Sequence, residues 1–274
     1  MTNFWQRTLT GLIFVGIIVA LTLINQFTFL ALLAIITLGC SYEFYKITNQ
    51  KPLTAVHYIG LAMAISLVLG KFWFKYIELL MFSSALLAIM AIVVLFSKQK
   101  NWQTIAFTFT GLFYIAVPLV VFYICCFQRV NAGFMVITEK QYNPLLALNL
   151  FILIWCSDTF AYLCGKAFGK HPFFPAISPK KTWEGFFGGL ILTTIAAYFI
   201  ALWFGLNPIY NIAIGIITVV FGSIGDLIES MLKRQYNIKD SGNMLPGHGG
   251  FLDRFDALLI ALPFNCIVYY YLYF

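Results

Sequence analysis

The chain has 274 residues, of which 61% are hydrophobic and only 10% are charged, and its mean hydropathy is +0.88. Soluble domains carry about 25% charged residues. This composition therefore excludes an ordinary soluble domain, a disordered chain, a disulfide-rich secreted scaffold and a basic nucleic-acid-binding domain. What remains is a polytopic membrane protein, in which 17 basic and 10 acidic residues must lie in or between apolar segments.

Apolar segments of membrane-spanning length recur along the chain. A transmembrane helix needs about 20 mainly apolar residues. About nine such helices are predicted, and kinks in place of breaks at Asn25–Gln26 or Asn207–Pro208 would lower that count. The first is expected to be a true span, because no small-residue cleavage site follows it. The predicted spans are 8–25, 27–45, 53–70, 76–96, 104–127, 145–165, 184–205, 208–225 and 255–274.

The positions of Lys and Arg predict the orientation, because these residues concentrate on the cytoplasmic side of a membrane. With nine spans, thirteen of the 17 basic residues fall on the side of the N-terminus. We therefore expect a multi-pass protein of the inner (plasma) membrane, with the N-terminus and the polar loops 166–183 and 226–254 in the cytoplasm.

The charged residues also divide the chain into two regions. Up to about residue 144 they lie mostly in loops, whereas beyond it they enter the ends of the spans. Ionisable groups within spans cost about 3 kcal/mol each at the helix centre and usually mark function. Residues 1–144 are predicted to be a transmembrane scaffold, and residues 145–274 a catalytic region.

Asp158 lies near the cytoplasmic end of the predicted span 145–165, among aromatic and apolar residues. One interpretation is structural, with Ser157, Asp158 and Thr159 satisfying one another and tying helices together. The other is that this acid belongs to a functional site on the side of the basic loops.

The segment from Ser178 to Glu184 has the features of a phosphate-binding helix start. Serine followed by Pro179 is typical of an N-cap and first helical position. Lys180 and Lys181 would then lie in the first turn, where the helix dipole disfavours cations, so a compensating anion is expected. The alternative is a lysine pair that contacts anionic lipid. The candidate phosphate-binding residues are Ser178, Lys180, Lys181, Thr182 and Glu184.

The most specific stretch covers residues 222–259. If residues 226–234 are helical, one face carries Asp226, Glu229, Ser230 and Lys233. A ladder of pairs on a solvated helix is the alternative.

Two more acids stand three residues apart at the start of the last span, at Asp253 and Asp256. Converging carboxylates suit Mg²⁺, which prefers oxygen ligands and often shares them with substrate phosphates. The glycine-rich turn at 246–250 lets backbone approach a ligand closely, and His248 within it is a secondary candidate.

This stretch resembles the signature of the phosphatidate cytidylyltransferase family, also called the CDP-diglyceride synthases. The matching residues are Ser230-x₂-Lys233-Arg234-x₄-Lys239-Asp240-x₅-Pro246-Gly247-His248-Gly249-Gly250-x₂-Asp253-Arg254-x-Asp256. Ser157–Thr159, Ser178–Thr182 and Gly225–Asp226 match as well. The resemblance covers the C-terminal half, whereas residues 1–144 share only the hydrophobic layout.

The resemblance implies a polytopic helical enzyme that joins CTP to phosphatidic acid, giving CDP-diacylglycerol and pyrophosphate. It also implies a requirement for Mg²⁺ and a homodimer as the working form. In the mechanism that we expect, a second cation is an option. A small-residue face at Gly185, Gly188 and Gly189 would serve either a dimer contact or packing within one chain.

Site roles follow from the residues and the resemblance together. The expected Mg²⁺ ligands are Asp226, Asp253 and Asp256. CTP and phosphate are assigned to Ser178, Lys180, Lys181, Thr182, Glu184, Ser230, Lys239 and Asp240. The catalytic group comprises Asp158, Lys233, Arg234, His248 and Arg254. Of these, Lys233, Arg234 and Arg254 are expected to meet the lipid phosphate or the leaving pyrophosphate.

Two other classes of function stay open from the residues alone. A CTP-dependent kinase of a polyprenol-type or phytol-type alcohol would use similar groups but transfer the γ-phosphoryl group. A secondary transporter would show broken helices near the midplane and symmetry between halves. The clustering of polar residues at one face of the C-terminal half disfavours the transporter.

Overall fold

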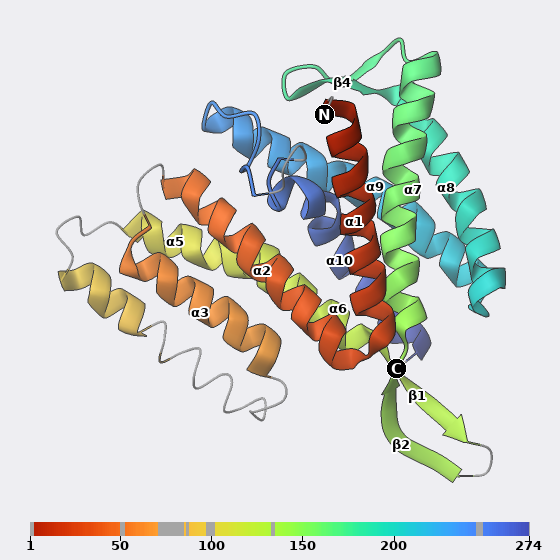
Figure 1. Cartoon of the computed structure of the whole chain (residues 1–274), viewed down its shortest axis with the longest axis horizontal. Helices are drawn as coiled ribbons and strands as arrows, with labels where there is room; N and C mark the ends of the chain where they lie inside the picture. Colours follow the sequence, from red (N-terminus) through yellow and green to blue (C-terminus); the bar gives the residue numbers. More distant parts are fainter. Residues whose placement is uncertain are drawn as a thin grey trace. The chain divides into compact units, whose positions relative to one another are not determined.

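The computed structural model describes residues 3–49, 53–70, 85, 88–96, 102–132, 135–244 and 249–273. Helices make up nearly all the regular structure of these residues, which confirms the all-α prediction (Figure 1). The protein is a membrane protein with multiple apolar helices. Within the described ranges, five helical segments are long and apolar enough to cross a membrane: Gln26–Asn49, Trp102–Cys125, Pro144–Phe168, Trp183–Phe204 and Pro208–Gln235.

The first helices follow the predicted spans. Helix α1 (Asn3–Ile24) and helix α2 (Gln26–Asn49) break at Asn25, and the Thr28 hydroxyl donates to the Leu21 carbonyl across the turn at 2.8 Å. Helix α3 (Ala55–Gly70) matches the third prediction. The predicted span 76–96 lies mostly outside the described residues, and residues 88–96 within it are helical.

The next predicted span, 104–127, corresponds to a continuous helical segment with a π-helical turn in its middle. Helix α5 (Trp102–Gly111) continues through the π-helical turn η1 (Leu112–Ala116) into helix α6 (Val117–Cys125). The amide of Val117 donates to the Leu112 carbonyl, five residues back. Pro118 follows directly and has no amide to donate, so a uniform α-helical pattern is interrupted at this point.

A hairpin follows this helical segment, where only a connection between spans was expected. Strand β1 (Phe127–Ala132) pairs antiparallel with strand β2 (Met135–Tyr142), with Phe127 opposite Tyr142. Val, Ile and Thr are frequent in this stretch, and such residues favour strands. Because the segment is short and lies between two long apolar runs, hydropathy alone did not reveal it.

Four long helices complete the chain. They are α7 (Pro144–Phe168), α8 (Trp183–Phe204), α9 (Pro208–Gln235) and α10 (Leu252–Tyr273). Helices α7 and α9 each begin with Pro at the first turn, capped by an Asn side chain, Asn143 and Asn207, as expected for N-termini. Helix α9 runs unbroken past residue 225, which confirms that residues 226–234 are helical.

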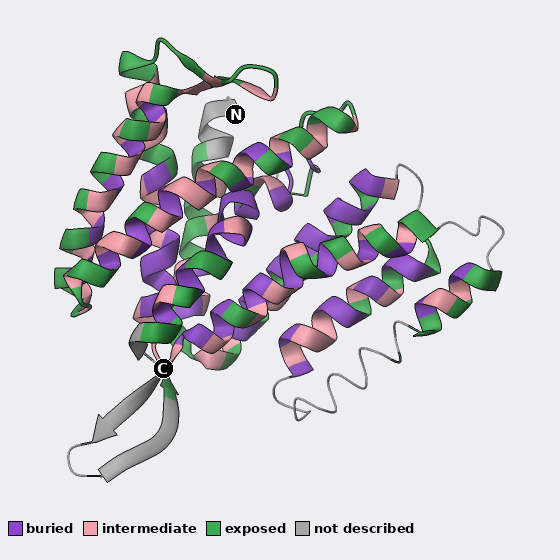
Figure 2. Ribbon diagram, turned by 180° about the vertical axis from the view of Figure 1, so that it is seen from behind, coloured by how far each residue is buried: buried purple, intermediate pink, exposed green. Residues whose placement is uncertain are grey.

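The structure forms two compact units. Unit 1 contains Met1–Leu21, Phe27–Val120 and Asp240–Phe255, and unit 2 contains Thr22–Gln26, Val121–Lys239 and Asp256–Phe274. Buried residues run along the helix sides that face their neighbours, and exposed residues along the opposite sides (Figure 2). The functional division expected at residue 144 concerns roles rather than packing, and it stays a prediction.

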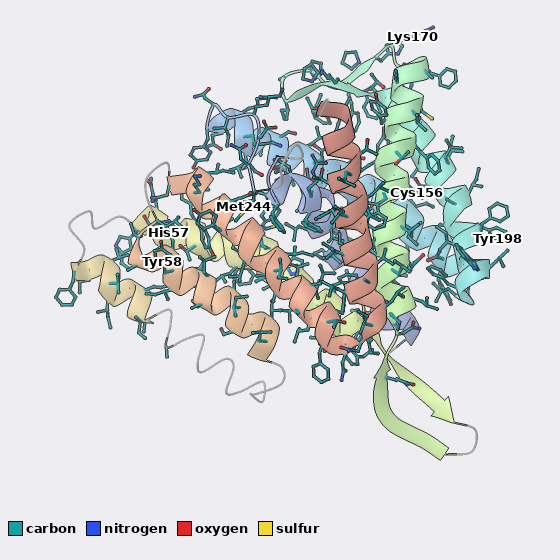
Figure 3. All side chains as sticks on the ribbon, in the orientation of Figure 1. His57, Tyr58, Cys156, Lys170, Tyr198 and Met244 are labelled. Carbon is teal, nitrogen blue, oxygen red and sulfur yellow. The ribbon has the colours of Figure 1, made fainter. Side chains whose placement is uncertain are left out.

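Small residues let α7 and α8 of unit 2 approach closely. A Cβ added at Gly185 would lie 2.8 Å from the Ala161 carbonyl oxygen, and one at Gly188 would lie 2.5 Å from the Cys164 Sγ. The face of small residues on α8 therefore packs against α7 within the chain. The other side of α8 is apolar and exposed, and Tyr198 points outward there (Figure 3), as expected for a surface solvated by lipid.

A buried hydrogen-bond network ties four helices of unit 2 together. The Asn149 amide donates to Asn211 Oδ1 at 2.6 Å and to the Tyr269 hydroxyl at 3.2 Å. Asn211 in turn donates to the Ala197 carbonyl at 2.7 Å, so the network joins α7, α8, α9 and α10. Polar side chains that bond across helices in this way act as specific links inside a membrane.

Candidate active site

The segment Ser178–Thr182 is a strand rather than the start of a helix, so that prediction was wrong. Strand β4 (Ser178–Thr182) pairs antiparallel with strand β3 (Pro172–Phe174) in a short hairpin. Helix α8 begins only at Trp183, with Thr182 as its N-cap, whose hydroxyl accepts from the Gly185 amide at 3.2 Å.

The later helix start explains why the two lysines are tolerated. With Thr182 as cap, the first turn of α8 carries Glu184 and no lysine, which is the charge that the helix dipole favours at this end. In the two-stranded hairpin, the missing amide of Pro179 costs little. The lysines therefore reach the site from a strand.

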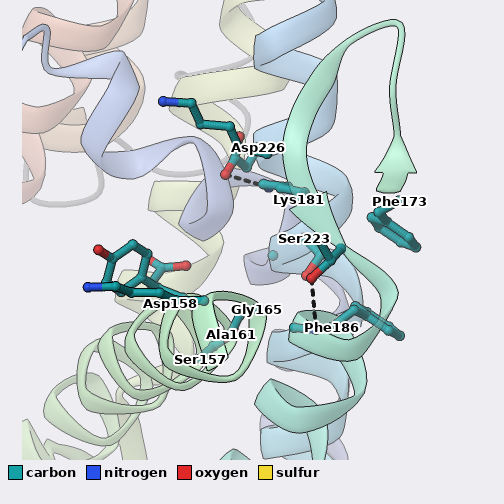
Figure 4. Close-up of a pocket in the computed structure, with 15 residues that line it drawn as sticks. Ser157, Asp158, Ala161, Gly165, Phe173, Lys181, Phe186, Ser223 and Asp226 are labelled. Carbon is teal, nitrogen blue, oxygen red and sulfur yellow. Dashed lines mark hydrogen bonds and ion pairs between the residues drawn. The ribbon is translucent and has the colours of Figure 1, made fainter. Parts of the chain in front are cut away.

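A cavity of about 400 Å³ opens in unit 2 beside this hairpin (Figure 4). It combines acidic, basic and hydroxyl side chains with an aromatic wall. Of the predicted site residues, five line it together: Asp158, Lys180, Lys181, Thr182 and Asp226. Residues far apart in sequence are thus brought to one place, and the site interpretation of Asp158 gains support over the purely structural one.

One face of α7 forms the floor of the cavity. Its lining residues come in pairs spaced by one helical turn: Ser157 and Asp158, Ala161 and Tyr162, Gly165 and Lys166. Lys166 was not predicted as a site residue, although its spacing of eight from Asp158 places both on one helical face. That periodicity is the signal that would have found it.

Lys181 and Asp226 form an ion pair across the cavity. Their Nζ and Oδ2 atoms lie 2.5 Å apart, with side chains 29% and 37% exposed (Figure 4). The Ser230 hydroxyl donates to the other carboxylate oxygen of Asp226 at 3.2 Å. The pair holds an ammonium group and a carboxylate in a partly solvated position, where both can exchange partners for a ligand.

The predicted polar face of α9 is present, and beyond Asp226 it is partly buried. Lys233 Nζ lies 2.6 Å from the carboxylate of the buried Glu229. Arg234 is exposed, and its Nε donates to the Ile177 carbonyl in the β3–β4 turn at 3.4 Å. Arg234 thus links α9 to the hairpin that carries the two lysines.

Asp256 is buried in the first turns of α10 and belongs to unit 2. The negative charges of Asp226, Glu229 and Asp158 act on its carboxyl group, and the amide of Ala257 donates to it at 2.7 Å. Three acidic groups of this unit therefore lie within electrostatic reach of Asp256, which is a costly arrangement unless cations are close by.

Glu184 is not among the residues that line the cavity. Its carboxylate accepts from the backbone amides of Lys170 and His171 and lies 2.6 Å from His171 Nδ1. Ser178 lies on β4 outside the lining too. Both residues shape the hairpin in this structure, and a direct role in binding CTP stays a prediction.

The remaining signature residues belong to the segment 239–254. Lys239 and Asp240 are exposed in the bends after α9, and Arg254 is exposed on α10. Asp253 accepts from the amides of Ser241 and Gly250, at 3.0 and 2.8 Å. His248 lies outside the described residues.

Comparison with known proteins identifies the family. The profile of the cytidylyltransferase family matches residues 5–272. The chain is 32% identical to the phosphatidate cytidylyltransferase of Bacillus subtilis (strain 168), over 96% of this chain and 97% of that protein. It is 33% identical to the phosphatidate cytidylyltransferase of Staphylococcus aureus (strain COL), over 94% of this chain and 95% of that protein. The chain belongs to the cytidylyltransferase family.

Membership covers both halves of the chain, so the cytidylyltransferase family extends over residues 1–144 as well as the signature. The resemblance noted from the signature is confirmed. Polar residues of the N-terminal half are therefore also candidates for a role in the protein's function. The most unusual of these is Glu43 on α2, which is 1% exposed and which the sequence analysis did not single out.

The donor chemistry of the site fits a magnesium ion that shares its coordination with substrate phosphates. Among the described residues, no three His, Cys, Asp or Glu side chains are placed to hold one metal ion. Mg²⁺ in phosphate-handling sites commonly uses one or two carboxylates and completes its shell with water and phosphate. Asp226, in the cavity, and the buried Asp256 offer such carboxylates.

Proposed function

We propose that the protein transfers the cytidylyl group of CTP to phosphatidic acid and releases pyrophosphate. The observation that carries this proposal is the cavity in which Lys166, Lys180 and Lys181 meet Asp158 and Asp226. Three ammonium groups beside two carboxylates suit a polyphosphate and its counter-ion. The relatives named phosphatidate cytidylyltransferase support the choice of substrates.

In the proposed reaction, a phosphate oxygen of phosphatidic acid attacks the α-phosphorus of CTP. A new phosphorus–oxygen bond forms, and the bond from that phosphorus to the oxygen shared with the β-phosphorus breaks. Pyrophosphate leaves with the electron pair. Because the attacking phosphate is already an anion, the reaction needs no strong general base, but two anions must be brought together.

The residues of the cavity meet that requirement. Lys180, Lys181 and Thr182 would hold the triphosphate, and the Asp226 carboxylate keeps the Lys181 ammonium in the cavity before CTP arrives. Preorganised charges of this kind stabilise charge in the transition state without reorganisation. Asp158 would orient a lysine or cation, and Lys233, Arg234 and Arg254 would meet the lipid phosphate or pyrophosphate.

Magnesium is part of the proposal: its candidate ligands are the carboxylates of Asp226, Asp253 and Asp256, of which one or two would bind an ion, and a second cation is an option. When bound, it would neutralise the charge of the phosphates. The excess of basic residues on the side of the N-terminus supports a site at the cytoplasmic face of the inner membrane. There, a lipid and a soluble nucleotide can meet. The homodimer rests on the family resemblance alone.

The test uses purified protein with Mg²⁺, phosphatidic acid and CTP labelled separately at the α- and γ-phosphates. The proposal expects α-label in the lipid and γ-label in pyrophosphate. Label from the γ-position in the lipid would instead identify a kinase. No transfer of either label by folded protein would contradict both chemistries.

A further inference from the structure

Glu43 occupies a position that its helix otherwise reserves for apolar side chains. On α2, Phe29, Leu33, Ile36 and Cys40 are spaced by three or four residues and are fully buried. Glu43 continues this row and is 1% exposed. Burying a carboxylate is costly unless it is hydrogen-bonded, so its partners indicate why it is there.

Those partners lie in the signature segment, some 200 residues later in the chain and in the same unit. Glu43 Oε2 accepts from the Ser241 hydroxyl at 2.9 Å and from the Leu252 amide at 2.9 Å. Leu252 is the first residue of α10, and the amides of a first turn have no partner within the helix. Glu43 therefore acts as an N-cap supplied by a different helix.

The segment is also shaped around this carboxylate. A Cβ added at Gly242 or Gly250 would collide with the Glu43 carboxyl oxygens, and at Gly250 also with the Ser241 hydroxyl. Gly249 has a φ of +82°, a conformation that only glycine adopts readily. At least two glycines of the segment are thus explained by the space that Glu43 occupies.

Ser241 connects Glu43 to Asp253. While its hydroxyl donates to Glu43, the same hydroxyl oxygen accepts from the Asp253 amide at 3.3 Å. Its backbone amide and that of Gly250 both donate to Asp253 Oδ2, at 3.0 and 2.8 Å. The orientation of the Asp253 carboxylate thus depends on the segment that Glu43 holds.

We infer that Glu43 is a positioning residue: through hydrogen bonds to Ser241 and Leu252 it fixes the backbone at Ser241 and at residues 249–252, and so the carboxylate of Asp253. This inference rests on the proposed function for its catalytic consequence, since Asp253 is a proposed Mg²⁺ ligand. Residues that orient a ligand commonly contribute about 10- to 100-fold in metal affinity or activity. Glu43 contributes to the reaction only in this indirect way.

Two substitutions separate hydrogen bonding from charge. Glu43→Gln keeps an oxygen that can accept both bonds, and its amide nitrogen would replace Oε1, for which the described residues provide no hydrogen-bond partner. Glu43→Ala removes both bonds. Thr37→Ala is a matched control, because Thr37 is also buried on α2 but its hydroxyl donates only to the Leu33 carbonyl of its own helix.

The first measurement is hydrogen exchange of peptides covering residues 240–255 in the purified, full-length protein. We expect faster exchange in Glu43→Ala, confined to these peptides, and near-native exchange in Glu43→Gln and Thr37→Ala. The second is the Mg²⁺ concentration that gives half the maximal rate of cytidylyl transfer. We expect it to rise, or the maximal rate to fall, by about tenfold or more in Glu43→Ala alone.

Unchanged exchange of residues 240–255 in Glu43→Ala would overturn the inference, as would a general rise of exchange throughout the helices. A Glu43→Gln variant as impaired as Glu43→Ala would also overturn it, because the charge would then be what matters. If the native protein transfers no cytidylyl group, the proposed function fails, and the exchange comparison still decides whether Glu43 holds the segment.

Discussion

Replacing Lys181 with alanine tests the assignment of the cavity to the triphosphate of CTP. The substitution removes the ammonium group that pairs with Asp226 at 2.5 Å and leaves the cavity walls otherwise intact. Hydrogen bonds to charged groups contribute about 1.5–3 kcal/mol each. Loss of one such contact to a phosphate predicts a fall of about 10- to 150-fold in kcat/KM for CTP.

The effect on stability should be much smaller. Both partners of the pair are partly exposed, at 29% and 37%, and pairs of this kind contribute about 0–1 kcal/mol. Once Lys181 is gone, water can solvate the Asp226 carboxylate. The variant should therefore keep its thermal midpoint within a few degrees while it loses CTP use.

The assay is the initial rate of lipid labelling as a function of CTP, at saturating phosphatidic acid and Mg²⁺. Lys170→Ala is the matched control, because Lys170 lies exposed just before the same hairpin (Figure 3) and does not line the cavity. A kcat/KM for CTP within twofold of the native value in Lys181→Ala would refute the assignment. An equal loss in both variants would show a general effect of surface charge instead.

Two further predictions concern buried groups. Asp256→Asn removes a buried carboxyl group that lies within reach of the charges of Asp226 and Glu229, and should lower kcat by about 100-fold or more at an unchanged or raised thermal midpoint; full activity would remove Asp256 from the metal site. Asn211→Ala breaks the bonds to Asn149 and to the Ala197 carbonyl, and should lower stability in detergent by about 1–2 kcal/mol. Its kcat should stay near native, because fifteen residues of α9 put Asn211 about 22 Å from Asp226; a large loss of kcat without a loss of stability would contradict this.

The helices could be predicted because hydropathy acts over about 20 residues at once. The breaks at Asn25 and Asn207 were both predicted, because in each case a polar residue separates two apolar runs and lowers the local hydropathy. The β1–β2 hairpin was not predicted, because hydropathy was averaged over the length of a membrane span. Its strands are too short to register in a window of membrane-spanning length, although Val, Ile and Thr favour them.

The site was predicted better in its composition than in its local structure. One cavity is lined by Lys180, Lys181, Asp158 and Asp226, as predicted. Charged groups at the ends of apolar spans gather in this way because burying them without polar partners is costly. The helix start assigned to Ser178 was wrong, because two residues in the same segment can act as caps. Pairing of β4 with β3 selects Thr182, and this tertiary contact is not visible in the segment itself.

Glu43 is the kind of residue that site prediction from clusters of polar residues misses. It is an isolated acid in an apolar helix, whereas the signature residues can be recognised by their number and spacing. Yet a single acid in phase with Phe29, Leu33 and Ile36 is, on energetic grounds, as informative as a cluster, because no lipid or water can satisfy it. Its partner had to be a donor elsewhere in the chain, and the glycines at 242 and 250 mark the place where side chains were kept small to admit it. In a membrane protein, the phase of an isolated polar residue on its helix is therefore evidence for a specific contact.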